Sequence, residues 1–324
     1  MMAPRILLVG AGSMGSLHAR VIAQSPLAEL AVIVDGREDA GRPLAEKYGA
    51  EWRPEIGNLD GIDGVVVAAS TEAHYELAIA VLSADKPLLV EKPVADGFGK
   101  TMTIINLAAD RGVPMMCGLL ERFNPAVVTA RALLHDPVYV SAVRHSPYAP
   151  RIRTGVGWDL LVHDVDLAIG ILGSEPSTIS GVLGQFHPLS VPGAEDVAEA
   201  VIGFENGSVA QISASRTGQR KIRTLSIQEL DRLIEVDLLR KDVTVYRHVS
   251  DQPADPEGRG YRQQTVIEIP ELITSQEPLA AQLAHFVGLI AGTVDADAER
   301  ASIIPAHRVV EELKALGITS SVAS

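Results

Sequence analysis

The stretch that decides the fold is Ile6-Leu7-Leu8-Val9-Gly10-Ala11-Gly12-Ser13-Met14-Gly15, an apolar run followed by glycines in the spacing G-x-G-x-x-G. The apolar run predicts a buried strand, and the glycines predict a tight turn into a helix. In such a turn Gly10 permits the bend, Gly12 lets a pyrophosphate approach the backbone, and Gly15 lets helix and strand pack closely. The helix N-terminus adds partial positive charge. The alternative is a glycine-rich turn with a structural role alone.

An acidic residue follows this motif at the distance that a dinucleotide site requires. Asp35 ends a second apolar run, residues 30–34, about 20 residues past Gly15, where a carboxylate accepts both ribose hydroxyls of NAD. The two features together predict dinucleotide binding. Asp35 would repel the 2′-phosphate of NADP, which favours NAD. Arg37 can offset that repulsion, so NADP stays possible, and the alternative for Arg37 is a solvated charge.

The pattern of apolar residues along the chain changes at about residue 120. Before this point short apolar runs alternate with segments of helix length, which is typical of a parallel sheet covered by helices on both faces. After it the runs are longer and alternate, which indicates antiparallel strands. Asn206-Gly207 between two such runs predicts a hairpin with a type I′ turn, because both central positions of that turn need positive φ.

The predicted fold is α/β plus α+β, in two domains. Residues 1–121 are predicted to form a dinucleotide-binding Rossmann domain. Residues 122–324 are predicted to form a domain for substrate binding and oligomerisation, whose large, mostly antiparallel open sheet is covered by helices on one face and whose last helices can pack back on the first domain. Residues 250–262, rich in Asp, Pro, Gly and Arg, are predicted to form a mobile loop or lid.

We expect this second sheet to mediate assembly. A sheet with helices on one face must cover or solvate the other face. Val201, Ile212 and Ala214 are therefore predicted to supply apolar side chains to a sheet-on-sheet contact between subunits. The expected assembly is a homodimer or a homotetramer.

Composition excludes several classes of partner. The chain of 324 residues has 28 Lys and Arg against 41 Asp and Glu, a net charge of −13. This balance argues against binding to nucleic acids or anionic membranes, because a protein needs a basic face to bind either of them. No stretch approaches the ~18 apolar residues of a membrane span. Cys117 is the only cysteine, which excludes an internal disulfide and a multi-thiolate metal site. We expect a small core residue at Cys117, no metal, and, in the absence of a signal peptide, a cytoplasmic protein.

Two later loops carry polar residues. Ser70 and Thr71 follow an apolar run at 64–68, where the next loop over a cofactor is expected, or else they only cap the following helix. Glu91-Lys92-Pro93 leaves a strand at its C-terminal end, the edge where open α/β sheets bind ligands. A lysine there can bind a ribose hydroxyl and reach a reacting alcohol. The alternative is an exposed strand-end lysine.

Asp159, His163 and Asp166 form a third polar group. In a helix over residues 158–172 they lie within about 60° of one another on one face of a mostly apolar segment. Such a stripe is either satisfied internally or faces a polar cleft. Structural hydrogen bonding, acid–base catalysis and a metal site with distant further ligands all remain open here. A histidine beside a carboxylate suits proton transfer near neutral pH.

These motifs in this order resemble the Gfo/Idh/MocA family of sugar-type oxidoreductases, and the likeness covers essentially the whole chain. It includes Ala68 to Thr71, His74 and the run from Lys86 to Pro93. The resemblance implies that Lys92, Asp159 and His163 surround the alcohol carbon that exchanges hydride with nicotinamide. In that arrangement His163 accepts the proton, Lys92 positions the hydroxyl and Asp159 orients both. Cofactor contacts are then expected from Gly10, Gly12, Ser13, Met14, Gly15, Asp35, Arg37, Ser70, Thr71, His74, Glu91, Lys92 and Pro93.

A narrower likeness concerns residues 121–127 and 144–153. These segments are similar to the branch of UDP-N-acetylglucosamine 3-dehydrogenases and related nucleotide-sugar 3-oxidoreductases. The resemblance implies substrate contacts from Arg122, Asn124, Arg144, Arg151 and Arg153. The last three arginines would be bidentate donors for a diphosphate in an otherwise acidic protein. The alternative is that they pair with nearby carboxylates.

We therefore predict an NAD(P)-dependent dehydrogenase that transfers a hydride between nicotinamide and a secondary hydroxyl of a pyranose sugar. The substrate expected from the narrower likeness is a UDP-linked N-acetylhexosamine, oxidised at C3. A free-sugar or inositol dehydrogenase of the same family is the alternative enzyme. A non-catalytic NAD-binding regulator is the alternative from a different class, and the presence of both Lys92 and His163 favours the enzymes.

Overall fold

The structure is a computed structural model that describes residues 3–150, 152–251 and 262–321. The chain divides by its contacts into two compact units. The first unit is Met1–Phe123 with Gln276–Glu311, and the second is Asn124–Ser275 with Glu312–Ser324. The first crossing between units falls close to the predicted boundary at 121/122. The segment Gln276–Glu311 belongs with the first unit.

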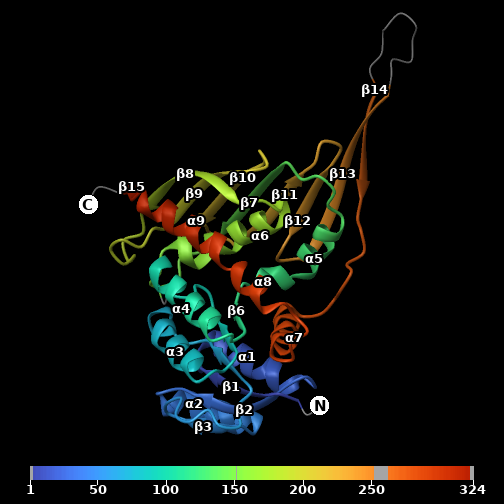
Figure 1. Ribbon diagram of the computed structural model, residues 1–324. Coiled ribbons are helices and arrows are strands. Elements are labelled where there is room, and N and C mark those ends of the chain that lie inside the picture. The colour runs from blue at the N-terminus through green and yellow to red at the C-terminus, as the bar shows by residue number, and fades with distance from the viewer. Residues whose placement is uncertain (1–2, 151, 252–261, 322–324) are drawn as a thin grey trace, which may run out of the picture. The chain divides into compact units, whose positions relative to one another are not determined.

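The first unit is built on a six-stranded parallel sheet with the strand order β3-β2-β1-β4-β5-β6 (Figure 1). The strands are β1 (Arg5–Val9), β2 (Glu29–Val34), β3 (Glu51–Arg53), β4 (Gly64–Val67), β5 (Leu88–Val90) and β6 (Met115–Cys117). Their continuous apolar sequence follows from burial on both faces, and the predicted Rossmann sheet is confirmed. The strand order reverses between β1 and β4. The loops after these strands therefore meet where such sheets bind ligands.

Helices cover this sheet. They are α1 (Ser13–Gln24), α2 (Glu38–Tyr48), α3 (Thr71–Ser83), α4 (Phe98–Asp110), α7 (Pro278–Ile290) and α8 (Ala296–Ala301), with a 3-10 turn η1 (Leu120–Phe123). The last helix, α9 (Ile304–Ala315), begins in this unit, and its residues from Glu312 on belong to the second unit. Although α7 comes late in the chain, its Phe286 belongs to the same buried cluster as Leu8 of β1. Gly64 permits this contact, because a Cβ there would lie 2.7 Å from Cδ1 of Ile290.

The second unit is a nine-stranded sheet with the order β14-β13-β12-β11-β7-β10-β9-β8-β15. The strands are β7 (Tyr139–His145), β8 (Pro176–Gln185), β9 (Val197–Phe204), β10 (Val209–Ser215), β11 (Ile222–Gln228), β12 (Leu233–Asp237), β13 (Asp242–Asp251), β14 (Arg262–Glu268) and β15 (Ile318–Ser321). All pairs are antiparallel except β7 with β10 and β8 with β15. The prediction of a large, mostly antiparallel sheet is confirmed.

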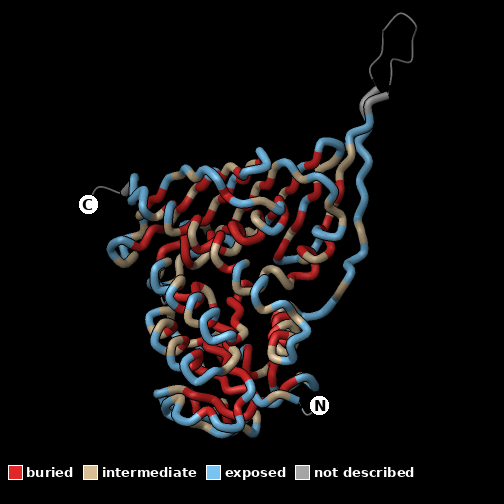
Figure 2. The backbone as a smooth tube through the Cα atoms, viewed as in Figure 1, coloured by how far each residue is buried: buried red, intermediate tan, exposed pale blue. Residues whose placement is uncertain are grey.

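Two helical segments pack against the middle of this sheet. α5 (Pro125–Ala132) contacts β12 and β13, and α6 (Val162–Leu172) contacts β7 and β10. Figure 2 shows buried backbone along the strands of each unit and exposed backbone on the surrounding loops. The alternation of β10 decides which side chains face the helices, and Ile212 and Ala214 are both fully buried there. Val201 is 47% exposed. The predicted intersubunit patch is therefore wrong for Ile212 and Ala214, because strand alternation places them in the core of the unit.

The hairpin at Asn206-Gly207 forms, but its turn differs from the predicted type I′. Only Gly207 has a positive φ, 84°, and Asn206 is not among the residues with positive φ. The N–H of Phe204 donates to the backbone oxygen of Ser208 and the N–H of Gly207 donates to that of Phe204, each at 3.0 Å. The Asn206 side chain accepts the N–H of Ser208 at 3.1 Å. A glycine with positive φ at the end of a three-residue loop produces this bulged hairpin.

The segment predicted as one helix over 158–172 has two parts. A π-turn, η2 (Gly157–Leu161), precedes α6. A π-turn is wider than an α-turn and is frequent at functional sites. Asp159 lies within it, and His163 lies in the first turn of α6. Most of the predicted loop or lid at 250–262 lies outside the described residues.

Candidate active site

The glycine turn after β1 has the geometry that its sequence predicts. Gly10 has φ 102°, and a Cβ on it would lie 2.5 Å from the backbone oxygen of Ala68 in the loop after β4. A Cβ on Gly15 would lie 1.9 Å from the oxygen of Gly10. A Cβ on Gly12 would meet no atom within 4 Å. Gly10 and Gly15 are therefore required by the fold itself, whereas the space beside Gly12 is open to a ligand backed by the uncapped N-terminus of α1.

Asp35 lies at the C-terminal end of β2 and holds this turn in place. One carboxylate oxygen accepts the N–H of Ala11 at 2.7 Å, and the other accepts the N–H of Arg37 at 2.9 Å. The side chain of Arg37 is 66% exposed, with Nε 3.6 Å from Asp35. The carboxylate is thus fixed beside the glycine turn, where the ribose of a dinucleotide would lie.

The remaining residues predicted around the turn are placed as follows. Ser13 is exposed at the start of α1, and Met14 is half-buried against the core. Ser70 is the N-cap residue of α3, but its side chain makes no capping hydrogen bond, and Thr71 begins the helix. Ser70 is exposed in the loop after β4, the strand next to β1.

His74 has a different role from the predicted one. It is 1% exposed, and its two ring nitrogens lie 2.8 Å from the backbone oxygen of Pro93 and 3.2 Å from that of Ala69. Both nitrogens are therefore occupied by protein groups. The prediction of a cofactor contact at His74 is corrected, because the ring ties the loop after β4 to the loop after β5. Pro93 is itself buried at this junction.

Glu91 also contacts protein. It is 7% exposed, and its Oε1 lies 2.8 Å from Nε2 of His18 in α1. A Cβ on Gly118 would lie 2.7 Å from the other carboxylate oxygen, so the side chain is enclosed. The predicted cofactor contact at Glu91 is corrected to an anchor between the end of β5 and α1. Lys92 follows it and is half-buried at the C-terminal edge of the sheet.

The second unit carries the acid–base candidates on η2 and α6. The side chain of Asp159 is 18% exposed, and His163 is half-buried. Asp166 is 7% exposed. Asp159 and His163 are thus partly open to solvent at the start of a helix that is otherwise mostly apolar and buried.

Arg216 supports this region and was not predicted. Its Nη2 donates to the backbone oxygen of Thr154 at 2.5 Å and lies 3.8 Å from Oδ2 of Asp159. Its side chain is 4% exposed. The buried guanidinium thus lies beside the carboxylate of Asp159. The only sequence signal for it is a cation at the end of the alternating run that follows Asn206-Gly207.

Glu195 is a second unpredicted support. It is fully buried and accepts the N–H of Gly157 at 2.8 Å and a hydrogen bond from Nζ of Lys314 at 2.7 Å. A Cβ on Gly155 would lie 2.2 Å from this carboxylate. Because Lys314 is 119 residues away in sequence, no local pattern indicates this pair.

The predicted substrate arginines are corrected at position 144. Arg144 makes two hydrogen bonds to Asp164, at 2.8 and 2.7 Å, and both side chains are 2% exposed. A guanidinium so enclosed is not a donor for a diphosphate. Arg153 is exposed, and Arg151 lies outside the described residues.

Arg122 and Asn124 have structural partners as well. Arg122 donates to the hydroxyl of Ser302 at 2.8 Å and pairs with Glu299 at 3.4 Å. Asn124 is 4% exposed, caps α5 by accepting the N–H of Ala126, and donates to the backbone oxygen of Leu238 at 3.1 Å. The predicted substrate contact at Asn124 is therefore corrected to a buried cap of α5, whereas a substrate contact from Arg122, whose side chain is 18% exposed, stays a prediction.

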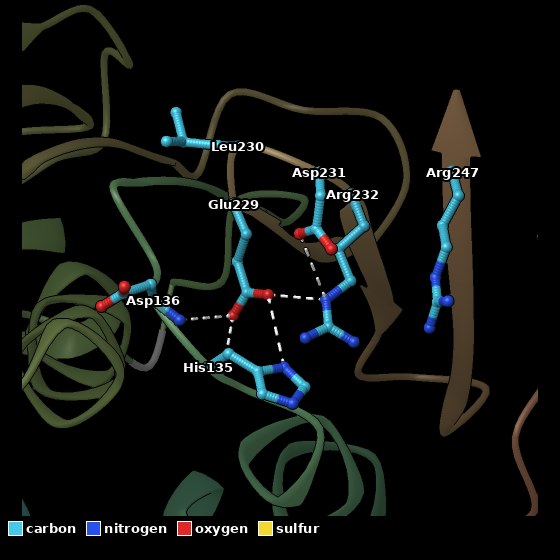
Figure 3. Close-up of a pocket in the computed structure, with 7 residues that line it drawn as sticks. All are labelled: His135, Asp136, Glu229, Leu230, Asp231, Arg232 and Arg247. Carbon is cyan, nitrogen blue, oxygen red and sulfur yellow. Dashed lines mark hydrogen bonds and ion pairs between the residues drawn. The ribbon is translucent and has the colours of Figure 1, made fainter. Parts of the chain in front are cut away.

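A cavity of about 410 Å³ in the second unit lies apart from all these residues (Figure 3). Glu229 is at its centre and accepts the N–H groups of His135 and Asp136 at 2.6 and 3.2 Å. Nε of Arg232 donates to Glu229 at 2.6 Å. Burial raises the pKa of Glu229 above its ordinary value of 4.5. These bonds fasten the turn between β11 and β12 to the loop after α5, so we assign the cluster a structural role.

Within the residues that the structure describes, no group of three or more His, Cys, Asp or Glu side chains is arranged to hold a metal ion. None of the described helices combines the length and the apolar character that crossing a membrane requires.

Comparisons with known proteins agree with this geometry. The model of the oxidoreductase family with an NAD-binding Rossmann fold, Gfo/Idh/MocA, matches residues 4–119, and the model of the Gfo/Idh/MocA C-terminal domain matches residues 127–228. The UDP-N-acetylglucosamine 3-dehydrogenase of Acidithiobacillus ferrooxidans is 28% identical over 288 residues, 88% of each chain. The scyllo-inositol 2-dehydrogenase (NAD(+)) of Bacillus subtilis is 28% identical over 233 residues, 66% of this chain and 67% of its own.

The similarity extends to solved structures. The structure of UDP-N-acetylglucosamine 3-dehydrogenase GnnA from Acidithiobacillus ferrooxidans superimposes with a TM-score of 0.84 at 25% identity, over 97% of this chain and 98% of that chain. The likeness therefore includes both units and almost the whole length of the two chains.

Proposed function

Because this chain belongs to the Gfo/Idh/MocA family of oxidoreductases, we propose that it oxidises a secondary hydroxyl of a pyranose sugar with NAD, at C3 of a UDP-linked N-acetylhexosamine. The observation that carries the proposal is the turn at Gly10 to Gly15. Protein atoms crowd Gly10 and Gly15, while the space beside Gly12 is open. Such a turn, with Asp35 beside it, fits the pyrophosphate and ribose of NAD.

The proposed reaction assigns three side chains to the alcohol. NAD, when bound, supplies a nicotinamide ring that accepts the hydride. The O–H proton must leave as the hydride leaves carbon, and His163 is the proposed acceptor because histidine is the side chain most often used for proton transfer near neutral pH. Lys92 donates to the alcohol oxygen and holds it. Asp159 orients the hydroxyl and the imidazole, and Arg216 lies 3.8 Å from that carboxylate.

The identity of the sugar is proposed from the similarity. The named UDP-N-acetylglucosamine 3-dehydrogenase matches 88% of this chain, whereas the inositol dehydrogenase matches 66%. The longer match supports a nucleotide-linked hexosamine. An inositol or free-sugar dehydrogenase is the second candidate, which several relatives named for inositol support.

Turnover with a substrate panel tests the proposal. Purified protein with NAD is offered UDP-N-acetylglucosamine, free N-acetylglucosamine, glucose and myo-inositol, and NADH is followed at 340 nm. We expect the highest kcat/KM with the UDP sugar. Turnover of myo-inositol or a free sugar alone selects the second candidate, and bound NAD without turnover of any polyol or sugar contradicts both.

A further inference from the structure

A second cavity in the second unit adjoins the proposed reaction site. It has a volume of about 400 Å³ and lies among the loops that follow β7, β8 and β10. Arg216 lines this cavity and is also the residue 3.8 Å from Asp159. A molecule in the cavity would therefore lie next to the group assigned to orient the substrate hydroxyl.

Two stacked rings form part of the cavity lining. The ring centroids of Tyr148 and His187 are 3.5 Å apart, and their planes differ by 8°. The Tyr148 hydroxyl donates to the backbone oxygen of Leu189 at 2.8 Å, and the N–H of Leu189 donates to Nδ1 of His187 at 3.2 Å. These bonds hold both loops around one platform. Because Nδ1 accepts a hydrogen bond, the proton of the neutral imidazole is on Nε2, which is then a donor.

The loop that carries His187 is itself fixed from the core. The buried carboxylate of Asp196 accepts the N–H groups of Phe186 and His187, each at 2.8 Å. Phe186 also lines the cavity and is 39% exposed. An aromatic side chain that the backbone holds at a cavity, with much of its surface exposed, offers a preformed face to a planar ligand.

Positively charged residues directly follow the cavity residues Arg216 to Gln219 in the chain. Residues 216–221 read Arg-Thr-Gly-Gln-Arg-Lys, with three cations and no acid in a chain whose net charge is −13. Arg220 and Lys221 are exposed, as is Arg153 in the loop before η2. Arg216 is committed to backbone oxygens, so the exposed cations are the ones available to a ligand. Rings beside cations match a molecule that joins a planar base to phosphates.

We propose that this cavity binds the nucleoside diphosphate part of the substrate, with the base stacked on the platform of Tyr148 and His187 and the diphosphate facing Arg220 and Lys221. The inference rests on the proposed function, since it assumes that the reacting sugar lies beside Asp159. It assigns nucleotide recognition to the loops after β7, β8 and β10. It also assigns the diphosphate to exposed cations and not to the buried Arg144, which the sequence favoured for that role.

Calorimetric binding of UDP, UMP and uridine to the full chain tests this site, with NAD at saturation so that the glycine turn is occupied. Replacing Tyr148→Leu removes one stacked ring, and we expect it to weaken UDP binding by about tenfold or more, while Tyr148→Phe changes it less than about threefold. The double variant Arg220→Gln/Lys221→Gln should weaken UDP but leave uridine unchanged, and should reduce the salt dependence of UDP binding.

Arg240→Gln is the matched control. Arg240 is in the turn between β12 and β13 with its side chain 80% exposed, and we expect no change in UDP binding. Binding of GDP, dTDP and ADP, each measured with NAD present, shows whether the site prefers a base other than uracil. The site is supported if one nucleoside diphosphate binds and responds to the variants as described. It is refuted if none binds at about 1 mM, or if Tyr148→Leu and the double variant bind like wild type.

The proposed nucleotide site and the proposed reaction are refuted by different results. Turnover of a free sugar or inositol, with no nucleotide bound, refutes the nucleotide site and leaves the dehydrogenase. UDP binding that responds to the variants, with no NADH formed from any sugar nucleotide, supports the site and refutes the proposed reaction. The affinity for NAD, measured on each variant, reports whether the chain has folded.

Discussion

Arg144 and Asp164 form an enclosed ion pair in the second unit, with two hydrogen bonds of 2.8 and 2.7 Å and both side chains 2% exposed. The pair joins β7 to α6, the helix that carries His163. The arginine that the sequence offers as a phosphate ligand is thus part of the support of the candidate active site. Because both side chains are enclosed, water screens the attraction between the two charges only weakly. The position of α6 therefore depends on this ion pair.

The first prediction concerns removal of one partner. Arg144→Met removes the guanidinium that donates two hydrogen bonds to the buried carboxylate of Asp164, and we expect the free energy of unfolding to fall by about 3–5 kcal/mol. Urea denaturation measures the change. The double variant Arg144→Met/Asp164→Leu should recover much of the loss, because no charge then remains buried. Equal instability of the single and double variants would contradict this account.

The second prediction uses two glycines of the same motif. Gly15→Ala would bring its Cβ to 1.9 Å from the oxygen of Gly10, so we expect a clear loss of thermal stability. Gly12→Ala meets no atom within 4 Å, and its φ of −74° suits alanine, so the melting temperature should stay close to that of wild type. NAD affinity of the Gly12 variant should nevertheless fall about tenfold or more, because a methyl group occupies the pyrophosphate position. Unchanged affinity would remove the proposed cofactor position.

The third prediction concerns catalysis. Lys92→Met and His163→Asn should each lower kcat by about 100-fold or more, since an acid–base group contributes roughly that factor. The Kd for NAD, from fluorescence titration, should change far less than kcat does. Lys100→Met is a matched control, because Lys100 is about half exposed and pairs with Asp96 on the surface. A variant at 92 or 163 with full turnover would contradict its assigned role.

The fourth prediction concerns pH. Burial raises the pKa of Glu229 above 4.5, so the folded state binds this proton more tightly than the unfolded state does. The stabilising contribution is fully present below about pH 4.5 and is lost as the pH rises through the folded pKa. The stability of wild type minus that of Glu229→Gln should therefore decrease with pH above about 4.5 in urea titrations. A difference that increases over this interval would reverse the assigned direction, and the exposed Glu205→Gln provides the control.

Much of the cofactor turn could be predicted from the sequence because its determinants are local. Gly10, Gly12 and Gly15 differ in the space around them as the motif predicts, and Asp35 lies beside them. Continuous apolar runs likewise indicated the parallel sheet, because a strand that is buried on both faces is apolar at nearly every position. Short or weakly patterned elements such as β3, α8 and β15 were not predicted. Their few residues give little periodic signal.

The sequence by itself determined the two types of sheet and the positions of the turn, the strand-end lysine and the helix with His163. The reason is that the spacing of apolar residues and the conformation of the backbone are local properties of the chain. Only the tertiary structure decided which polar groups are committed to protein partners. Glu91 meets His18 from 73 residues away, and Glu195 meets Lys314 from 119. A long side chain takes whichever partner the packing of distant elements brings near, so the same motif residues can bind a ligand or anchor the fold.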